Sequence, residues 1–149
     1  MKSWNQEAAM QKPSARPASA TATPWFDLSL LYVEDDRDSR NIMTFILQRR
    51  FRQVLVSENG YEGLQVFICN RPDLVLTDIR MPEMDGIEMA LAIHRLSPDT
   101  PVICLSAHGD EWQIEEAMSA GMADYLIKPL DIDALDESLH GIFGKKPAR

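Results

Sequence analysis

The chain has 149 residues, 45% of them apolar, which is enough for one domain with a buried core and too few for two comfortable ones. Its net charge is −8, and this acidic excess argues against a surface that binds nucleic acid directly, because such a surface needs a basic patch. No stretch is apolar over the roughly 18 residues that spanning a bilayer requires, and the N-terminus lacks the apolar core of a secretory signal. Cys69 and Cys104 lie among apolar neighbours without CxxC spacing, so we expect two reduced, buried thiols. Together these features predict a cytoplasmic protein with no membrane contact.

Residues 1–26 are expected to form a disordered tail or linker. They are rich in Ala, Ser, Thr, Pro and Gln and show no apolar period. Three basic residues and one acidic residue give this segment a net charge of +2, so the rest of the chain carries −10. We expect one folded domain over residues 27–146 and a short C-terminal tail over residues 147–149.

From residue 28 onward, short apolar runs alternate with segments of helical spacing. The apolar runs predict buried strands over residues 28–33, 53–57, 74–77, 102–106 and 124–127. The segments between them predict helices over residues 38–50, from Asn59 or Gly60 to before Pro72, and over 86–96, 110–120 and 131–143. Five such units in alternation predict an α/β fold, a five-stranded parallel sheet with helices on both faces and right-handed crossovers.

Apolar spacing also predicts how these helices begin and which residues share a face. Asp38 or Ser39 is the expected N-cap of the first helix. The apolar residues at helical spacing are Ile42, Phe45 and Ile46 in the first helix, Tyr61, Leu64 and Ile68 in the second, Ile87, Ala90 and Leu91 in the third, Ile114, Ala117 and Met118 in the fourth, and Leu135, Leu139, Ile142 and Phe143 in the fifth.

Four of the predicted strands run into residues that can handle a phosphate or a metal ion. The acidic run over residues 34–36 follows the first strand, Asp78 the third, Ser106 ends the fourth, and Lys128 follows the fifth. In open α/β sheets the carboxyl ends of the strands share the edge where ligands bind, so we expect these side chains to cluster there. Such a cluster suits a divalent cation together with a phosphoryl group.

Asp78 is the strongest candidate nucleophile, because a carboxylate can attack a phosphoryl group to give an acyl phosphate. This chemistry needs positioning and neutralisation of the charge on the phosphoryl oxygens. Glu34 and Asp35 would hold Mg²⁺, a hard ion that prefers oxygen ligands. Lys128 would pair with one phosphoryl oxygen and Ser106 would donate a hydrogen bond to another. Each residue alone is more often a cap, a turn or a surface group, and their joint occurrence at four strand ends carries the hypothesis.

Four stretches of the chain resemble the receiver domain of two-component response regulators: residues 32–36, 78–86, 106–107 and 124–129. The resemblance covers residues 28–144 and implies a flavodoxin-like, doubly wound sheet. It implies that Asp78 is the phosphoacceptor, that Glu34 and Asp35 form the acidic pair at Mg²⁺, and that the main-chain carbonyl of Arg80 is a further metal ligand.

The resemblance also implies Ser106 and Tyr125 as a switch pair and Lys128 as the lysine that contacts the phosphoryl group, with a bond before Pro129 that is commonly cis in the family. Asp36 is left as a solvated or capping residue. Arg80 and His108 occupy positions that flank the entrance to the phosphoryl group in the family, and His108 is either a base or a simple loop residue.

The predicted function is that of a phosphorylation-dependent switch rather than an enzyme, since it would catalyse only its own phosphorylation and dephosphorylation. A histidine kinase or phosphotransfer protein would supply the phosphoryl group. Because no output domain follows residue 149, the signal would pass through a downstream protein target or onward phosphotransfer, at a face made by the fourth helix, fifth strand and fifth helix. The sequence does not decide whether a homodimer forms on phosphorylation. It also does not identify the kinase or the pathway, or show whether the chain is free-standing.

Two other functions compete with this prediction. An aspartate-nucleophile phosphohydrolase of the haloacid-dehalogenase kind would also use Asp, Ser, Lys and Mg²⁺. Those enzymes carry a second Asp two residues after the nucleophile, where this chain has Arg80, and their nucleophile follows the first strand. A receiver that has lost phosphorylation and acts only as a binding module is the other alternative, and the complete residue set argues against it.

Overall fold

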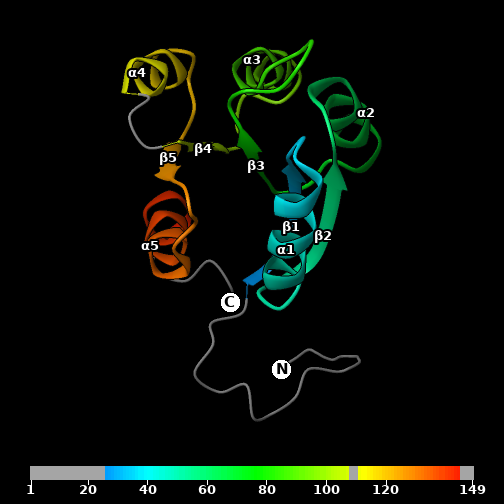
Figure 1. Ribbon diagram of the computed structural model, residues 1–149, viewed down its shortest axis with the longest axis vertical. Coiled ribbons are helices and arrows are strands. Elements are labelled where there is room, and N and C mark those ends of the chain that lie inside the picture. The colour runs from blue at the N-terminus through cyan, green and yellow to red at the C-terminus, as the bar shows by residue number, and fades with distance from the viewer. Residues whose placement is uncertain (1–25, 108–110, 145–149) are drawn as a thin grey trace.

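The computed structural model describes residues 26–107 and 111–144 (Figure 1). Residues 1–25 of the predicted tail over residues 1–26, the tail over residues 147–149, the predicted helix start at Asp110, and His108 lie outside the described residues. Phe26, the last residue of the predicted tail, is instead buried and begins the first strand. Strands and helices alternate along the chain, as predicted: β1 (Phe26–Val33), α1 (Arg37–Leu47), β2 (Phe51–Ser57), α2 (Gly60–Asn70), β3 (Leu74–Asp78), α3 (Gly86–Leu96), β4 (Val102–Ser106), α4 (Glu111–Ser119), β5 (Asp124–Ile127) and α5 (Ile132–Phe143). None of the helices in these ranges is long and apolar enough to cross a membrane.

The five strands form one parallel sheet in the order β2-β1-β3-β4-β5. Helices α2, α3 and α4 cover one face, and α1 and α5 cover the other (Figure 1). The predicted doubly wound, flavodoxin-like fold is therefore confirmed. The strand order reverses between β1 and β3, and in open α/β sheets the crevice outside the carboxyl ends of strands at such a point is where ligands bind.

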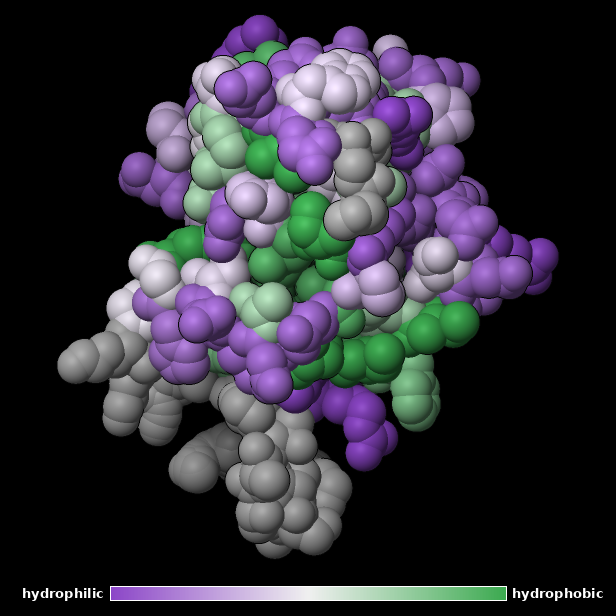
Figure 2. All heavy atoms as spheres, turned by 60° about the vertical axis from the view of Figure 1, so that its left-hand side comes forward, coloured by the Kyte–Doolittle hydropathy of each residue, from purple (hydrophilic) through white to green (hydrophobic). Residues whose placement is uncertain are grey.

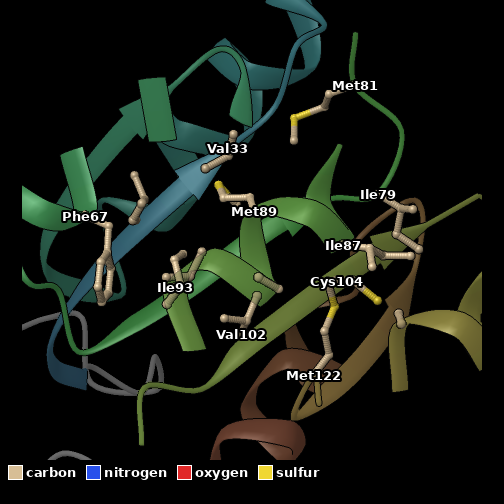
Figure 3. Close-up of a cluster of buried hydrophobic side chains, with 14 residues drawn as sticks. Val33, Phe67, Ile79, Met81, Ile87, Met89, Ile93, Val102, Cys104 and Met122 are labelled. Carbon is tan, nitrogen blue, oxygen red and sulfur yellow. The ribbon is translucent and has the colours of Figure 1, made fainter. Parts of the chain in front are cut away.

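Buried apolar side chains on both faces of the sheet hold the helices in place. On the α2–α3 side, Val33 of β1, Phe67 of α2, Met89 and Ile93 of α3 and Val102 of β4 belong to one continuous cluster (Figure 3). On the other side, a second cluster joins the sheet to α1 and α5. Burying a side chain of this size contributes about 1.5–3 kcal/mol, so the sheet edge that carries the candidate site rests on a rigid base.

In four helices, α1 to α4, some of the apolar residues that spacing placed inside are exposed. Ile42 and Phe45 of α1 are 64% and 65% exposed, and Tyr61 and Ile68 of α2 are also exposed. The inward face of α2 is instead built on Gly60, Gly63 and Phe67. Small residues let α2 approach closely, since a Cβ on Gly63 would lie 2.8 Å from the sulfur of Met89. Leu91 of α3 and Met118 of α4 were likewise expected inside and are exposed.

Helix ends and one cysteine also differ from the sequence prediction. Helix α1 is capped by Asp36, whose carboxylate accepts a hydrogen bond from the Ser39 amide at 2.9 Å, and not by Asp38 or Ser39. It ends at Leu47, three residues before the predicted end, because the chain turns there to place the Arg50 carbonyl against the Phe26 amide at 2.6 Å. Cys104 is buried as predicted, whereas Cys69 is exposed. The bond between Lys128 and Pro129 is cis.

Candidate functional site

The parallel register brings the predicted site residues to one edge of the sheet. Asp78, the last residue of β3, pairs with Leu105 of β4, and Ser106 at the end of β4 pairs with Ile127 of β5. Strands β3 and β4 are buried along their whole length, so their final side chains have little freedom to move. Glu34 follows β1 directly and is almost fully buried.

Three carboxylates converge at this edge. One oxygen each from Glu34, Asp35 and Asp78 lies within 4.8 Å of the other two. Main-chain amides orient two of them, because the Asp36 amide donates to Glu34 Oε2 at 3.1 Å and the Ile79 amide donates to Asp78 Oδ1 at 3.0 Å. Carboxylate oxygens are the ligands that hard divalent cations such as Mg²⁺ prefer, so the donor set fits that class of ion.

Lys128 lies opposite these carboxylates as their counter-charge. Its Nζ is 3.0 Å from Asp78 Oδ2 and 3.3 Å from Glu34 Oε1. Burial alone would lower the pKa of Lys128, but the hydrogen bond and the negative charge of Asp78, with the charge of Glu34, raise that pKa above its ordinary value. Lys128 is therefore a fixed cation at neutral pH, held where a group attached to Asp78 would meet it.

The surroundings of Glu34 favour its neutral form, whereas those of Lys128 favour the charged form. Burial raises the pKa of Glu34 above the ordinary value, and the charge of Asp78 adds to this effect, while the Asp36 amide and Lys128 lower it. The ionised form of Glu34 is thus held in the fold at a cost, which a bound divalent cation would offset.

A cavity of about 130 Å³ lies between Asp78 and the ends of β4 and β5. Ser106 and Lys128 line it, and Arg80 and Gln113 stand at its rim, where Arg80 Nε donates to Gln113 Oε1 at 3.1 Å. A second hollow beside it is lined by Asp35, Arg80 and others. The space beside Asp78 therefore offers a hydroxyl and an ammonium on one side, and the carboxylates on the other.

Ser106 and Tyr125 lie at different depths. Ser106 is almost fully buried, and its hydroxyl donates to the adjacent Ala107 carbonyl at 3.2 Å. Tyr125 of β5 is 39% exposed. Ser106 therefore lines the cavity beside Asp78, whereas Tyr125 lies toward the outer surface.

Two residues at the site had no predicted role. Gly86 opens α3, and a Cβ there would lie 2.2 Å from the Asp78 carbonyl oxygen, so only glycine lets the β3–α3 loop close over the strand end. The Asp85–Gly86 pair signals a turn in the sequence, but the close approach to Asp78 has no local signal. Gln113 was missed because its partner Arg80 is 33 residues away in the chain.

Asp35→Asn is expected to weaken Mg²⁺ binding by at least about tenfold, because it removes one of few charged ligands of a hard cation. Asp36→Asn is the matched control, since Asp36 uses its carboxylate to cap α1 and an asparagine can accept the same hydrogen bond. Calorimetric titration with MgCl₂ measures both affinities. Equal losses in the two variants would show that the acidic pair has been assigned wrongly.

The fold and the comparisons with known proteins identify the class of protein. Residues 30–140 match the family model of the response regulator receiver domain. The chain belongs to this family. The family match leaves the phosphohydrolase alternative without support.

The transcriptional regulatory protein GlrR of Escherichia coli is 37% identical over 110 residues, which cover 74% of this chain and 25% of GlrR. The transcriptional regulatory protein AfsQ1 of Streptomyces coelicolor is 32% identical over 114 residues, covering 76% of this chain and 50% of AfsQ1. The chain thus spans a quarter to a half of these relatives, and their activities as whole proteins are not carried over to it.

Solved structures agree with the family assignment. A response regulator receiver domain protein from Clostridium thermocellum superposes with a TM-score of 0.72 at 30% identity, covering 79% of this chain and 95% of that one. The structure titled FixJ-N superposes with a TM-score of 0.70 at 28% identity, covering 78% of this chain and 93% of that one. The likeness therefore extends over nearly all of those two chains.

Proposed function

We propose that this receiver domain is a phosphorylation-dependent switch in which Asp78 accepts a phosphoryl group from a histidine kinase or a phosphotransfer protein. The observation that carries the proposal is the position of Lys128, whose ammonium contacts both Asp78 and Glu34 beside a cavity that Ser106 also lines. Glu34, Asp35 and Asp78, together with the main-chain carbonyl of Arg80, would hold Mg²⁺. The bound ion neutralises charge on the phosphoryl oxygens.

In the proposed reaction, a carboxylate oxygen of Asp78 attacks phosphorus and forms an acyl phosphate. The bond between phosphorus and the donor's imidazole nitrogen breaks, and that nitrogen keeps the electron pair. Lys128 then pairs with one phosphoryl oxygen and Ser106 donates to another. The same site releases the phosphoryl group to water, so the domain catalyses only its own phosphorylation and dephosphorylation.

The signal would leave through the α4–β5–α5 face, defined as the exposed side of residues 111–144. Tyr125 lies on this face, and Ser106 lies between it and Asp78. We propose a domain over residues 27–146 that works in the cytoplasm and contacts a downstream protein target or passes the phosphoryl group onward, without contacting nucleic acid or membrane itself.

Ser106→Ala is expected to accept a phosphoryl group and yet respond weakly at the α4–β5–α5 face. A hydroxyl bonded to a charged phosphoryl oxygen contributes about 1.5–3 kcal/mol, which shifts a two-state population by about one to two decades. Amide NMR shifts with and without beryllofluoride, a phosphoryl mimic, measure the response. Ser119→Ala, at an exposed position of α4, is the control and should respond like the natural chain. Full-sized shifts around Tyr125 in Ser106→Ala would rule out this coupling.

A further inference from the structure

The α4–β5–α5 face presents four large apolar side chains to solvent. Strand β5 is an edge strand of the sheet, and its Tyr125 and Ile127 are both exposed. Trp112 of α4 is 62% exposed, and Met118 at the other end of that helix is exposed as well. Figure 2, which turns this side toward the viewer, shows apolar side chains gathered in a hollow that polar side chains border. Contiguous exposed apolar surface of this kind marks interaction sites.

The same face is strongly and uniformly acidic. Residues 111–144 contain eight carboxylates and a single lysine, which gives this segment −7 of the chain's net charge of −8. The lysine is Lys128, and its ammonium is directed at Asp78 and Glu34. Two partly buried carboxylates are engaged internally, since Asp136 pairs with Arg50 and Asp124 accepts a hydrogen bond from Ser138, and the exposed Asp131 caps α5 by accepting from the Asp133 amide.

The six carboxylates other than Asp124 and Asp136 are exposed, and no residue of the described ranges forms a salt bridge with them. They are Glu111, Glu115, Glu116, Asp131, Asp133 and Glu137. Every arginine between residues 26 and 107 lies before β4, on other elements of the fold. Two of these arginines reach toward the segment, since Arg50 pairs with Asp136 of α5 and Arg80 donates to Gln113 of α4, but neither forms a salt bridge with the six exposed carboxylates in the described ranges.

The acidity of residues 111–144 distinguishes between a second copy of the chain and a basic partner protein as the occupant of this face. In a symmetric dimer each copy contributes the same surface, so a second copy would set the exposed carboxylates of one chain against those of the other, and within residues 111–144 Lys128, directed at Asp78, is the single lysine or arginine. Like charges placed against each other across an interface are strongly unfavourable. A partner that carries apolar residues flanked by Lys or Arg meets both features of the face at once.

We propose that the α4–β5–α5 face binds a basic amphipathic segment of a partner protein. Apolar side chains of that segment cover Trp112, Tyr125 and Ile127, and its basic residues approach the six exposed carboxylates. The inference rests on the proposed function and deepens it, because it names the chemistry of the partner that would contact the proposed signalling face. The attraction also steers the encounter, so binding falls as salt rises.

The test uses the full chain with MgCl₂ and beryllofluoride and two fluorescein-labelled probe peptides. One is an 18-residue amphipathic helix of Leu, Trp and Lys, and the other replaces each Lys by Glu. Fluorescence anisotropy is expected to show the Lys peptide binding at least about tenfold more tightly than the Glu peptide, with the preference shrinking between about 50 and 300 mM NaCl. Neutralising the face in Glu111→Gln/Glu115→Gln/Glu137→Gln is expected to remove most of the preference.

The matched control is Asp38→Asn/Glu83→Gln/Asp99→Asn, which neutralises three exposed carboxylates on other elements and is expected to leave binding unchanged. Trp112→Ala is expected to weaken binding of the Lys peptide without affecting phosphorylation of the chain. Equal affinity for both peptides, or equal effects of the two triple variants, would overturn the inference.

Two further outcomes would assign the face to another occupant and likewise overturn it. The first is a dimer of the activated chain in sedimentation that Trp112→Ala abolishes. The second is tighter peptide binding after Lys2→Gln/Lys12→Gln/Arg16→Gln, which would show that the chain's own N-terminal segment competes for the face. Covalent labelling of the same protein preparations by a phosphodonor, with MgCl₂ and without beryllofluoride, separates the two proposals. An unlabelled chain refutes the switch, whereas a labelled chain that treats both peptides alike refutes only this inference.

Discussion

Gly86→Ala is expected to lower the free energy of unfolding by about 3 kcal/mol, since an added methyl group meets immovable backbone. The new Cβ would lie 2.2 Å from the Asp78 carbonyl oxygen and 3.2 Å from the Ile79 Cα. Relief requires the β3–α3 loop to move away from the end of β3, which also shifts the Asp78 carboxylate. Urea denaturation followed by circular dichroism measures the loss, and labelling by a phosphodonor should slow in parallel.

Gly141→Ala is the matched control for that substitution. Gly141 lies in α5 with nothing within 4 Å of an added Cβ. The change should raise stability by about 0.5–1 kcal/mol, because alanine loses less conformational freedom in a helix than glycine does. If the two substitutions have the same effect, the close approach at Gly86 does not constrain the site.

Glu34→Gln is expected to have opposite effects on stability and on metal binding. Burial raises the pKa of Glu34, so its charged form opposes folding at neutral pH when no cation is bound. Glutamine removes this charge and still accepts the hydrogen bond of the Asp36 amide, which should stabilise the metal-free protein by about 1 kcal/mol. Loss of a charged ligand should weaken Mg²⁺ binding by more than about tenfold.

The pH dependence follows from the same shift. A carboxyl group whose pKa is raised by folding binds a proton more readily in the folded state, so it adds stability as pH falls through that raised pKa and opposes folding above it. Thermal unfolding in EDTA between about pH 5 and pH 8 should therefore show the advantage of Glu34→Gln growing as pH rises. Glu58→Gln, at an exposed carboxylate, is the control. A less stable Glu34→Gln in EDTA would contradict this account of the buried charge.

The sheet and the positions of the site residues could be predicted because they depend on local sequence. Each site residue directly follows or ends a short apolar run, and the ends of parallel strands meet at one edge. Helix α3 and strand β4 have the predicted bounds because local signals mark where they begin. The Asp85–Gly86 turn signal marks the start of α3, and Pro98 and Pro101 precede β4.

Features that depend on distant neighbours could not be predicted. Apolar spacing identified a stripe on α2 that is exposed. The inward stripe contains Gly63, and only the fold shows why it is glycine, since Met89 and Val33 lie against it. The contact of Lys128 with both Asp78 and Glu34, and the pairing of Arg80 with Gln113, join segments far apart in the chain. The acidic residues of the segment 111–144 could be counted from the sequence. That they share one face with exposed Trp112 and Tyr125 could not be predicted from it.

The most direct test of the central proposal is to locate the phosphoryl group. The full chain is incubated with acetyl phosphate and MgCl₂, reduced with borohydride so that an aspartyl phosphate becomes homoserine, digested, and mapped by mass spectrometry. The proposal predicts one phosphoryl group per chain and homoserine at residue 78, with labelling lost in EDTA and in Asp78→Asn and retained in Asp36→Asn. Homoserine at any other position, a label that persists in Asp78→Asn, or undiminished labelling in EDTA would contradict it.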